Sequence, residues 1–570
     1  MVKGKKMDPA NAGAGNQKRM KFLLWGLVFI FAVMMSLPFL LPHSGFVALF
    51  GFIPLLCMER IASLSGERRV WLYHYSAFVL WNAFTTFWVC NATVGGGLFA
   101  IFANALQMSV IFGLFRFSKR YFSGALPYIF LAAMWIAWER AYFDAEISWP
   151  WLVLGNSFAR SVGSVQWYEY TGVLGGSLWV WTVNLLFFAL MVALSDGSWF
   201  YRYNVKAKAA LLSACAVSVA APVIWSKVIF NNYKEKENPQ EVLIVQPNID
   251  PYNKFEAMTQ SQQNAILLDQ IIKAIPDRKT ETGISNPAGN VGYDMKPHAM
   301  EQSPLLVLAP ETFTGDIVTN DFSRSMTYRR FISFLKDYPA VDMLFGASSY
   351  TYTDSSKAPS YNARKLGDGR WVESHNSAMV VDGSGESEIF HKSKLVVAVE
   401  KTPYPALLTR IDDMLGGVMG RCVGQGEISL LHCGDVPFGC AVCYESVYGE
   451  YCTGYVRKGA EFLSVITNDA WWGNTPGYRQ HLSYSSLRAI ETRRSIARCA
   501  NTGISALIDQ RGVIHEQTSW WEPAIIRGTI NKNDAITFFV KYGDMAGRLC
   551  TFVFALLFLA LLVRFVMPKR

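Results

Sequence analysis

Three residues that could act together in covalent chemistry each follow a short apolar run. Cys443 ends the run Val-Pro-Phe-Gly-Cys-Ala-Val, Glu311 follows Leu-Leu-Val-Leu-Ala-Pro, and Lys392 lies in Ile-Phe-His-Lys-Ser. Apolar runs of this length between turn residues are typical of buried β-strands. The sequence therefore predicts that a cysteine, a glutamate and a lysine stand at strand ends.

These residue types suit nucleophilic attack on a carbonyl group. A cysteine attacks as the thiolate, which an adjacent base makes accessible near neutral pH. Glu311 would take the thiol proton and later return it to the leaving group. Lys392 would stabilise the oxyanion of the tetrahedral intermediate, together with backbone N–H groups that follow the nucleophile. Glu400, eight residues after Lys392, would orient the lysine or an incoming amine.

Each residue alone has a simpler interpretation. A cysteine at the end of an apolar strand most often contributes only packing, and Glu311 after Ala-Pro could cap a helix. Lys392 and Lys394 could both be solvated turn charges, and nothing local distinguishes them. In order, and on matching elements, the three residues favour a catalytic set.

The segment from about 241 to 537 alternates between strand-like and helix-like stretches, which predicts an α/β sheet structure covered by helices. The segment 278–303 is rich in Gly, Pro, Asn and Thr, which indicates an inserted loop. The predicted strands are 242–248, 305–309, 343–349, 377–382, 428–432, 436–443, 462–468 and 504–509, and the helices include 255–275, 329–336 and 478–499.

The rest of the chain has the composition of a membrane protein. The 570 residues are 51% hydrophobic and 14% aromatic, and a stretch of about 20 apolar residues is long enough to cross a bilayer as a helix. We expect about eight transmembrane helices, near 21–42, 45–58, 72–92, 97–115, 125–142, 172–194, 208–230 and 548–566. The second is short and could be tilted, bent or re-entrant.

Lys and Arg residues fall between these apolar segments, so topology explains the net charge of +9 better than nucleic-acid binding does. They cluster at 3–21, 60–69, 116–120 and 202–208, whereas the turns 42–45 and 91–97 have none. The positive-inside rule then places both termini in the cytoplasm and 241–537 outside it. A cleaved signal peptide is the alternative for the first stretch, but its apolar core is too long.

We expect three parts: a membrane domain over 1–235, a catalytic domain over 236–540 and a transmembrane helix within 541–570. Ten cysteines are scattered along the chain, and their spacing assigns no disulfide. Cys440 and Cys443 are two residues apart, but no second cysteine pair and no His/Cys arrangement typical of zinc accompanies them, so the sequence predicts no metal and no cofactor.

The set of Glu311, Lys392 and Cys443 resembles the triad of the nitrilase (carbon–nitrogen hydrolase) superfamily. Further motifs are Thr-Asn-Asp-Ala-Trp-Trp-Gly (467–473), Gln480-His481, Arg-Ala-Ile-Glu (488–491), Ala-Asn-Thr-Gly (500–503), Val-Gln-Pro-Asn-Ile (245–249), Asn376-Ser377 and Trp-Pro-Trp-Leu (149–152) with Gly155 and Gly172. These motifs resemble those of one branch of the superfamily, the apolipoprotein N-acyltransferases. The likeness is specific over 443–503 and looser elsewhere.

This resemblance implies an αββα nitrilase-like domain on the periplasmic side of a bacterial inner membrane. It also implies a two-step acyl transfer by a monomer, from a phospholipid to the cysteine and then to the α-amine of a diacylglyceryl-modified apolipoprotein. By this resemblance Cys443 would be the nucleophile, Glu311 the base and Lys392 the lysine of the triad. The residues that support them would be Glu400, Tyr444 and Glu445.

The chain departs from the family near the lysine and at the substrate entrance. Ala-Val-Glu-Lys-Thr-Pro (398–403) stands where the family commonly has Phe-Gly-Glu-Tyr-Val-Pro, and Phe255 where it often has Trp. Phe255, Trp471 and Trp151 are candidates for substrate binding. Trp151 could equally belong to an interfacial belt of aromatic residues.

Other functions remain open at this stage. A membrane-tethered amidase or nitrilase would use the same triad and resolve its thioester with water, but one anchoring helix would suffice for it. A catalytically inactive scaffold would not need the triad. A transporter would need ionisable residues within its spans.

Overall fold

The computed structural model describes residues 9–201, 203–252, 254, 257–276, 304–414 and 419–567, so the inserted loop predicted at 278–303 lies outside the described residues. Internal contacts divide the chain into two units. Unit 1 contains Met1–Asp144, Trp149–Asn231 and Asp544–Arg570, and unit 2 contains Ala145–Ser148 and Asn232–Gly543.

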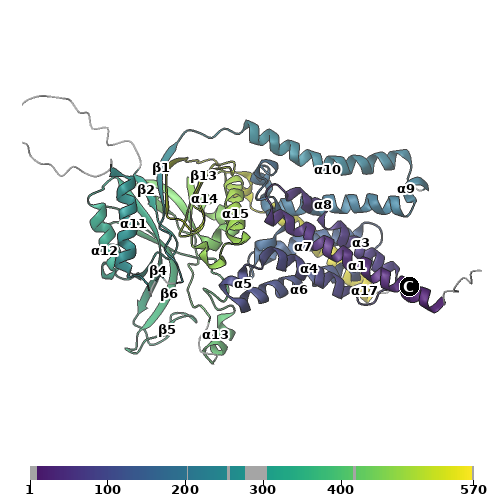
Figure 1. Ribbon diagram of the computed structural model, residues 1–570, viewed down its shortest axis with the longest axis horizontal. Helices are drawn as coiled ribbons and strands as arrows, with labels where there is room; N and C mark the ends of the chain where they lie inside the picture. The colour runs from purple at the N-terminus through teal and green to yellow at the C-terminus, as the bar shows by residue number, and fades with distance from the viewer. Residues whose placement is uncertain are drawn as a thin grey trace, which may run out of the picture. The chain divides into compact units, whose positions relative to one another are not determined.

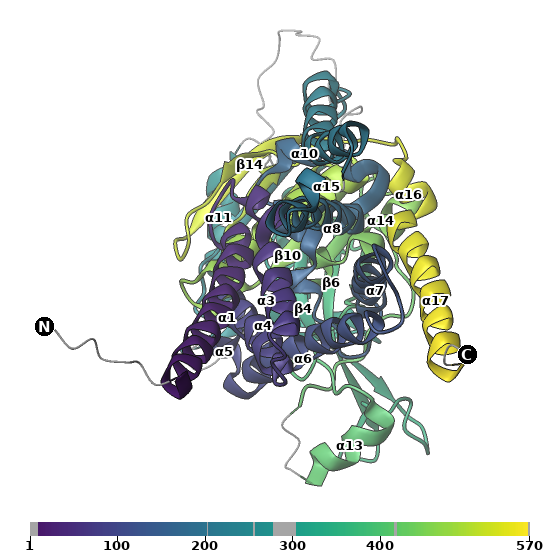
Figure 2. The ribbon, with the colours of Figure 1, turned by 90° about the vertical axis from the view of Figure 1, so that its right-hand side faces the viewer.

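Unit 1 is helical (Figures 1 and 2). Its C-terminal helix packs against α7 although some 400 residues separate them in sequence, and Arg564 donates to the Tyr121 carbonyl over 2.8 Å. Its longer helices are α1 Pro9–Leu40, α3 Ile53–Leu64, α4 Val70–Thr86, α6 Val94–Ser118, α7 Leu126–Tyr142, α8 Tyr168–Ser195, α10 Val205–Asn232 and α17 Met545–Val566, and the short ones are α2 Ala48–Gly51, α5 Val89–Ala92 and α9 Ser198–Tyr201.

Six helical segments in the described part of unit 1 are long and apolar enough to cross a membrane: Gln17–Leu40, Gly45–Leu64, Val94–Ser118, Tyr168–Ser195, Val205–Asn232 and Met545–Val566. The two remaining predicted spans coincide with α4 and α7, which have 17 residues each. Seventeen residues is the lower end of the length that can span a bilayer. The second segment is divided into a 3-10 turn, α2 and α3, which agrees with its expected irregularity.

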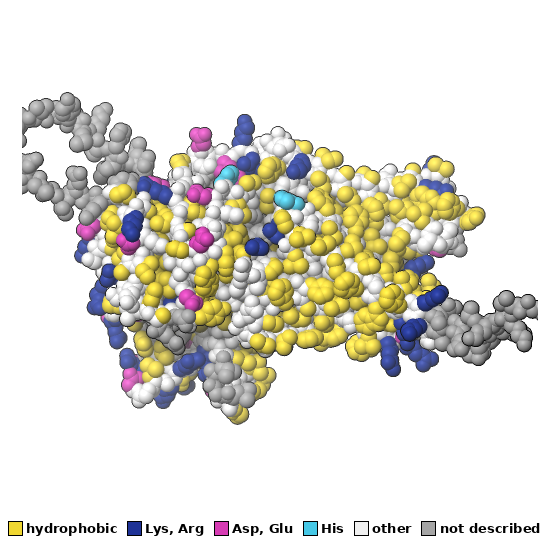
Figure 3. Space-filling view, viewed as in Figure 1, with side chains coloured by type: hydrophobic (Ala, Val, Ile, Leu, Met, Phe, Trp, Pro, Cys, Tyr) yellow, Lys and Arg dark blue, Asp and Glu magenta, His cyan; other side chains and the backbone are white. Residues whose placement is uncertain are grey.

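The surface of these helices is apolar. Figure 3 shows hydrophobic side chains over most of the helical part, and Lys and Arg side chains gather at its right-hand end in this view. In α10 and α17 only 11% of the most apolar 18-residue window is buried. Helices that expose so much apolar surface are suited to contact with lipid.

Unit 2 contains two sheets. The first sheet has the strand order β14-β1-β2-β4-β6-β5, and in addition β3 pairs with β4 and β7 pairs with β6. The second sheet has the order β13-β12-β11-β10-β9-β8. The strands of the first are β1 Pro239–Gln246, β2 Leu305–Leu308, β3 Thr314–Val318, β4 Val341–Thr353, β5 Arg364–Lys365, β6 Trp371–Val381, β7 Ser387–His391 and β14 Ala524–Asn531; those of the second are β8 Leu431–Cys433, β9 Val436–Val442, β10 Phe462–Thr467, β11 Ile496–Ala500, β12 Ala506–Ile508 and β13 Ile514–Gln517.

Alternating side chains of β1 show how the sheets form layers. Val242 and Ile244 join a core shared with β9 and β10, whereas Leu243 and Val245 pack toward helices α11 and α12. Successive side chains of a strand point to opposite faces, so the first sheet is buried on both faces. The order of layers is helices, sheet, sheet, helices, which confirms the predicted αββα sandwich. Its helices are α11 Gln260–Ala274, α12 Met326–Leu335, α13 Pro405–Met414, α14 Gly449–Arg457, α15 Pro476–Thr492 and α16 Phe538–Tyr542.

Two element predictions were wrong. The helix predicted over 478–499 ends at Thr492, where Arg493 takes a left-handed conformation (φ 49°), and Ile496–Ala500 forms β11 between β10 and β12. A short apolar run cannot be assigned to helix or strand by periodicity alone. The strand predicted over 428–432 is displaced to Leu431–Cys433.

Candidate active site

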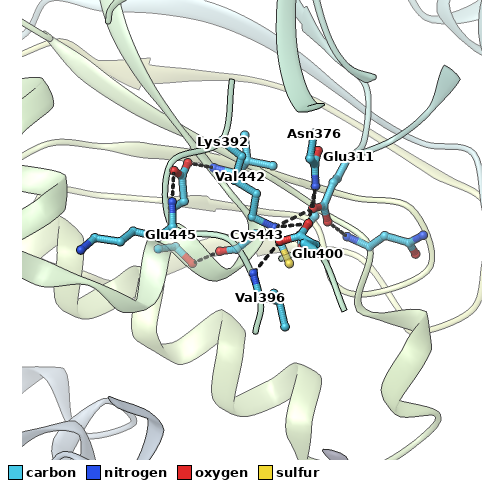
Figure 4. A network of polar contacts seen from close by, with 12 residues as sticks. Glu311, Asn376, Lys392, Val396, Glu400, Val442, Cys443 and Glu445 are labelled. Atoms are coloured by element: carbon cyan, nitrogen blue, oxygen red, sulfur yellow. Dashed lines mark hydrogen bonds and ion pairs between the residues drawn. The ribbon is translucent and has the colours of Figure 1, made fainter. Parts of the chain in front are cut away.

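Glu311, Lys392 and Cys443 meet in unit 2 at the ends of three strands. Glu311 follows β2, Lys392 follows β7 directly, and Cys443 follows β9. Both β2 and β9 pair in parallel with their neighbours β4 and β10, and ligands of such sheets bind beyond the carboxyl ends of the strands. Figure 4 shows the sulfur of Cys443 beside the lysine and the two carboxylates.

Lys392 is the centre of a buried polar cluster, which we call the lysine cluster: Lys392, Glu311, Glu400 and Asn376. Its Nζ lies 3.1 Å from Glu311 Oε1 and 2.9 Å from Glu400 Oε1. The side-chain amide of Asn376 donates to the same two oxygen atoms, over 2.8 Å and 2.6 Å. The other Glu311 oxygen accepts the Asn468 N–H over 3.1 Å. The carboxylates are therefore fixed by several donors.

Burial and charge determine the protonation of the lysine and the cysteine. Burial opposes the ammonium form of Lys392, but the Glu311 and Glu400 carboxylates outweigh it and hold the lysine pKa well above its ordinary value. Burial, followed by the Glu311 charge, raises the pKa of the Cys443 thiol well above its ordinary value, and Lys392 only partly compensates. The thiol is therefore protonated at neutral pH, so a base must remove its proton.

The backbone at Cys443 is left-handed. Cys443 has φ 52° and opens the 3-10 helix η7 (Cys443–Val447). This conformation is uncommon for a residue with a Cβ, and such strain is found at functional sites. The turn projects the nucleophile from the end of β9.

Glu445 connects the nucleophile turn to the lysine loop. Its Oε2 accepts the Val442 N–H over 2.8 Å, and its Oε1 accepts the N–H groups of Ser393 (2.7 Å) and Lys394 (3.2 Å). The hydroxyl of Tyr451 also donates to Oε1 over 2.8 Å. Burial raises the pKa of this carboxyl. Glu445 thereby holds the two backbone segments that present Cys443 and Lys392.

A second buried charged cluster, the histidine cluster, consists of Asp469, His481 and Arg498. Asp469 Oδ1 lies 2.9 Å from His481 Nδ1, and Arg498 Nη2 lies 2.7 Å from Asp469 Oδ2 and 3.1 Å from Nδ1. All three side chains are fully buried. Burial would raise the pKa of Asp469, but His481 and Arg498 outweigh it and lower the pKa to about 2.

Possible metal ligands can be tested within the described residues. One group, Cys443, Asp469 and His481, has ligand atoms within 4.8 Å of one another. Asp469 already binds Arg498 and His481, and His481 Nε2 already contacts the Cys443 carbonyl over 3.0 Å. These contacts already occupy the Asp469 carboxylate and both ring nitrogens of His481, so neither residue is available to bind a metal.

The remaining predicted residues are less closely connected to the triad. Tyr444 is buried, and its hydroxyl donates to the Ser148 carbonyl over 3.0 Å. Trp471 is 41% exposed and packs edge-to-face on Tyr252. Trp151 is fully buried in unit 1, stacked on Trp149. Phe255 lies outside the described residues.

The segment 398–403, whose sequence differs from the family's usual motif, still brings Glu400 into contact with Lys392. Ala398, not the residue at the family's glycine position, takes the left-handed conformation (φ 66°). Glu400 Oε2 accepts the Val396 N–H over 2.7 Å, which closes this loop. The loop therefore reaches a compatible path without glycine.

Sequence reasoning missed two parts of the site. Asn376 donates to both carboxylates, and His481 contacts the nucleophile's carbonyl, yet neither was predicted to contribute. Both belong to motifs quoted above, Asn376-Ser377 and Gln480-His481. Their position in those motifs was the only available signal.

Comparison with known proteins agrees with this geometry. Residues 358–538, which include Lys392 and Cys443, match the family model of carbon-nitrogen hydrolases, and this is the class that the fold and site define. Residues 31–186 match the apolipoprotein N-acyltransferase N-terminal domain. The chain belongs to the apolipoprotein N-acyltransferase family, and it is a multi-pass bacterial membrane protein.

The similarity to members of this family extends along the chain. An apolipoprotein N-acyltransferase of Chlorobaculum tepidum is 26% identical over 92% of this chain and 93% of its own length. That of Geobacter metallireducens is 25% identical over 91% of both chains. Apolipoprotein N-acyltransferase 1 of Treponema denticola is 24% identical over 94% of this chain and 96% of its own.

Proposed function

We propose that this enzyme transfers a fatty acyl chain from a membrane phospholipid, through a thioester on Cys443, to the α-amine of the diacylglyceryl-modified N-terminal cysteine of an apolipoprotein. The observation that carries the proposal is the combination of a Glu-Lys-Cys site with a domain of apolar helices in one chain. The similarity to N-acyltransferases along more than nine-tenths of the chain supports it.

In the first half-reaction Glu311 takes the proton of the Cys443 thiol, and Sγ attacks the ester carbonyl of the phospholipid. The carbonyl oxygen becomes an oxyanion, and Lys392 supplies a positive charge to it. Collapse of the intermediate breaks the bond between the carbonyl carbon and the glycerol oxygen. Glu311 returns its proton to that oxygen, so a lysophospholipid leaves and the acyl group remains as a thioester.

In the second half-reaction the α-amine of the acceptor attacks the thioester carbonyl. A carbon–nitrogen bond forms, and the bond from the carbonyl carbon to Sγ breaks. The nitrogen loses a proton through Glu311, and the released thiolate is reprotonated. Glu400, which contacts Lys392 over 2.9 Å, keeps the ammonium oriented and offers a second carboxylate to an incoming amine.

The positions of substrates and membrane follow from this proposal. The acyl donor stays in the bilayer, which gives a reason for many apolar helices where one anchor would be enough for an amidase. We assign the catalytic domain to the periplasmic side of the inner membrane and both termini to the cytoplasm, from the distribution of Lys and Arg. One chain contains all the proposed catalytic residues, so a monomer suffices.

The test is the intact mass of the purified protein, with and without phosphatidylethanolamine, followed by digestion to locate any adduct. We expect one fatty-acyl increment on Cys443, which disappears when a diacylglyceryl peptide with a free α-amine is added. Cys443→Ala should show no increment, whereas Cys433→Ala, a buried cysteine of β8, should behave as wild type. Absence of the adduct, with turnover of small amides instead, would contradict the proposal and favour the amidase.

A further inference from the structure

The histidine cluster ends on the backbone of the nucleophile. His481 Nε2 lies 3.0 Å from the Cys443 carbonyl oxygen. A carbonyl oxygen can only accept, so we assign a proton to Nε2, which makes Nε2 the donor of this hydrogen bond. On the other side of the ring, Asp469 and Arg498 fix its orientation. A rigid donor is thereby directed at one peptide group.

This peptide group joins Cys443 to Tyr444 and is trans. A trans peptide is planar, with its C=O and N–H pointing in opposite directions. A donor that fixes the Cys443 carbonyl therefore also fixes the direction of the Tyr444 N–H. In strand-to-helix turns that present a nucleophile, the N–H of the next residue is a donor to the oxyanion.

The same carbonyl has a second donor. Ser446 Oγ lies 2.8 Å from the Cys443 oxygen and 3.0 Å from His481 Nε2. The serine bond is local, within η7, whereas His481 comes from α15, on another segment of the chain. Because Cys443 is left-handed (φ 52°), its turn needs contacts of this kind to stay in place.

We propose that His481 is a positioning residue for the oxyanion site: its hydrogen bond to the Cys443 carbonyl aims the Tyr444 N–H at the oxygen of the reacting acyl group. Asp469 and Arg498 act through His481. This inference rests on the proposed function, because it assumes that Cys443 is acylated. It adds a role for a residue that does not touch the substrate.

Two reactions of Cys443 separate this role from a general structural one. Acylation by a p-nitrophenyl ester passes through an oxyanion, whereas alkylation by iodoacetamide does not. For His481→Leu we expect acylation to fall by about 10²–10³-fold, the usual effect of losing an oxyanion donor. Alkylation should fall at least tenfold less. Equal losses in the two reactions, or no loss in acylation, would overturn the inference.

Rescue and coupling give further readouts. His481→Gln keeps an N–H donor and should recover most of the acylation rate, with KM for the ester unchanged. Ser446→Ala should cause a smaller loss, and its effect should not simply add to that of His481→Leu, because both donors bind one carbonyl. Full additivity, or no difference between Gln and Leu, would count against the role.

The ester also separates this inference from the proposed function. If the wild-type protein is acylated by the ester but by no phospholipid, the donor assignment fails while the His481 comparison still holds. If neither reagent acylates Cys443, both proposals fail.

Discussion

The lysine cluster and the histidine cluster both lie beside Cys443, yet they differ in what their charges contact. In the lysine cluster the carboxylates and the ammonium contact one another, and Glu311 and Glu400 keep 7% and 14% of their side chains exposed. In the histidine cluster every side chain is fully buried, and its last contact is a backbone carbonyl. The first arrangement can exchange protons with a substrate, and the second can only hold geometry.

This difference predicts that substitutions in one cluster mainly lower the catalytic rate, whereas substitutions in the other also lower the stability of the fold. Removing one carboxylate from the lysine cluster should impair chemistry more than folding, because Lys392 keeps the other carboxylate as its partner. Removing a charge from the histidine cluster should impair folding as well, because breaking a buried ion pair leaves the partner charge uncompensated.

Glu311→Gln should produce the largest effect on rate. The amide cannot accept the thiol proton, so we expect both half-reactions to slow by about 10²–10⁴-fold, the range for loss of a general base. Acyl-enzyme formation and its discharge, followed by mass spectrometry, measure the two steps separately. Because the pKa of Cys443 is raised well above its ordinary value, part of the rate should return at high pH, where the thiolate forms without a base.

Glu400→Gln is the matched control for that prediction, since it removes the other carboxylate from Lys392. It should slow the reaction less than Glu311→Gln does. An equal loss from the two substitutions would show that both act only through the lysine, and would remove the distinction between base and supporting acid.

Asp469→Asn should reduce stability more than Glu311→Gln or Glu400→Gln does. Arg498 and His481 lose their carboxylate in a fully buried place, and breaking such a pair costs about 3–5 kcal/mol. Thermal unfolding in detergent measures the difference. If Asp469→Asn unfolds at the wild-type temperature but transfers no acyl group, the histidine cluster takes part in catalysis, and the distinction that we draw between the two clusters is wrong.

The pH dependence of stability sharpens the same point. The folded-state pKa of Asp469 is about 2, below its ordinary value of 3.8. A lowered pKa gives stability that is complete above the unfolded pKa and is lost as the pH falls through 3.8 toward 2. The size of the shift corresponds to roughly 2 kcal/mol. The wild type should therefore lose this amount of stability on acidification, and Asp469→Asn should not.

Gly346→Ala should lower the transfer rate less than Glu311→Gln does and the stability less than Asp469→Asn does. A Cβ on this β4 residue would lie 2.5 Å from Glu311 Cα and 2.7 Å from the Pro310 carbonyl, so the base must move with its backbone. Overpacking of this kind costs about 1–3 kcal/mol, and a base displaced by about 1 Å slows transfer by up to about 10²-fold.

Gly367→Ala is the control, because a Cβ at Gly367 meets no atom within 4 Å. It should leave both the unfolding temperature and the transfer rate unchanged. If Gly346→Ala also leaves the transfer rate unchanged, the approach of β4 to Glu311 does not position the base.

The sequence predicted the triad because each residue follows an apolar strand, and strand ends are where a sheet presents functional groups. It did not predict Asn376 or the contact of His481 with the Cys443 carbonyl. Asn376 lies within a strand, and His481 lies in a helix whose residues other than Pro476 and Arg479 are buried. Side chains in such places are ordinarily structural, and their contacts cross between elements that no local pattern connects.

The bounds of helices and strands were also only partly predictable from the sequence. Hydropathy located the helices but not their exact bounds, since α4 covers Val70–Thr86 where the sequence predicts a span over 72–92. Likewise, the apolar run that became β11 was compatible with helix until its two partner strands were known. Pairing with β10 and β12 decided the outcome for β11.

The pairing of β1 with β14 has a consequence for how the chain is made. Pro239 pairs with Asn531 and Gln246 with Ala524, antiparallel, at the edge of the first sheet. Contacts between residues so distant in sequence form late and slowly. The sheet that carries Glu311 therefore cannot be completed until the ribosome has synthesised Ala524–Asn531. A chain that stops before Ala524 leaves β1 as an open apolar edge, which favours aggregation. Pulse-labelled chains of increasing length should become protease-resistant only when β14 is included.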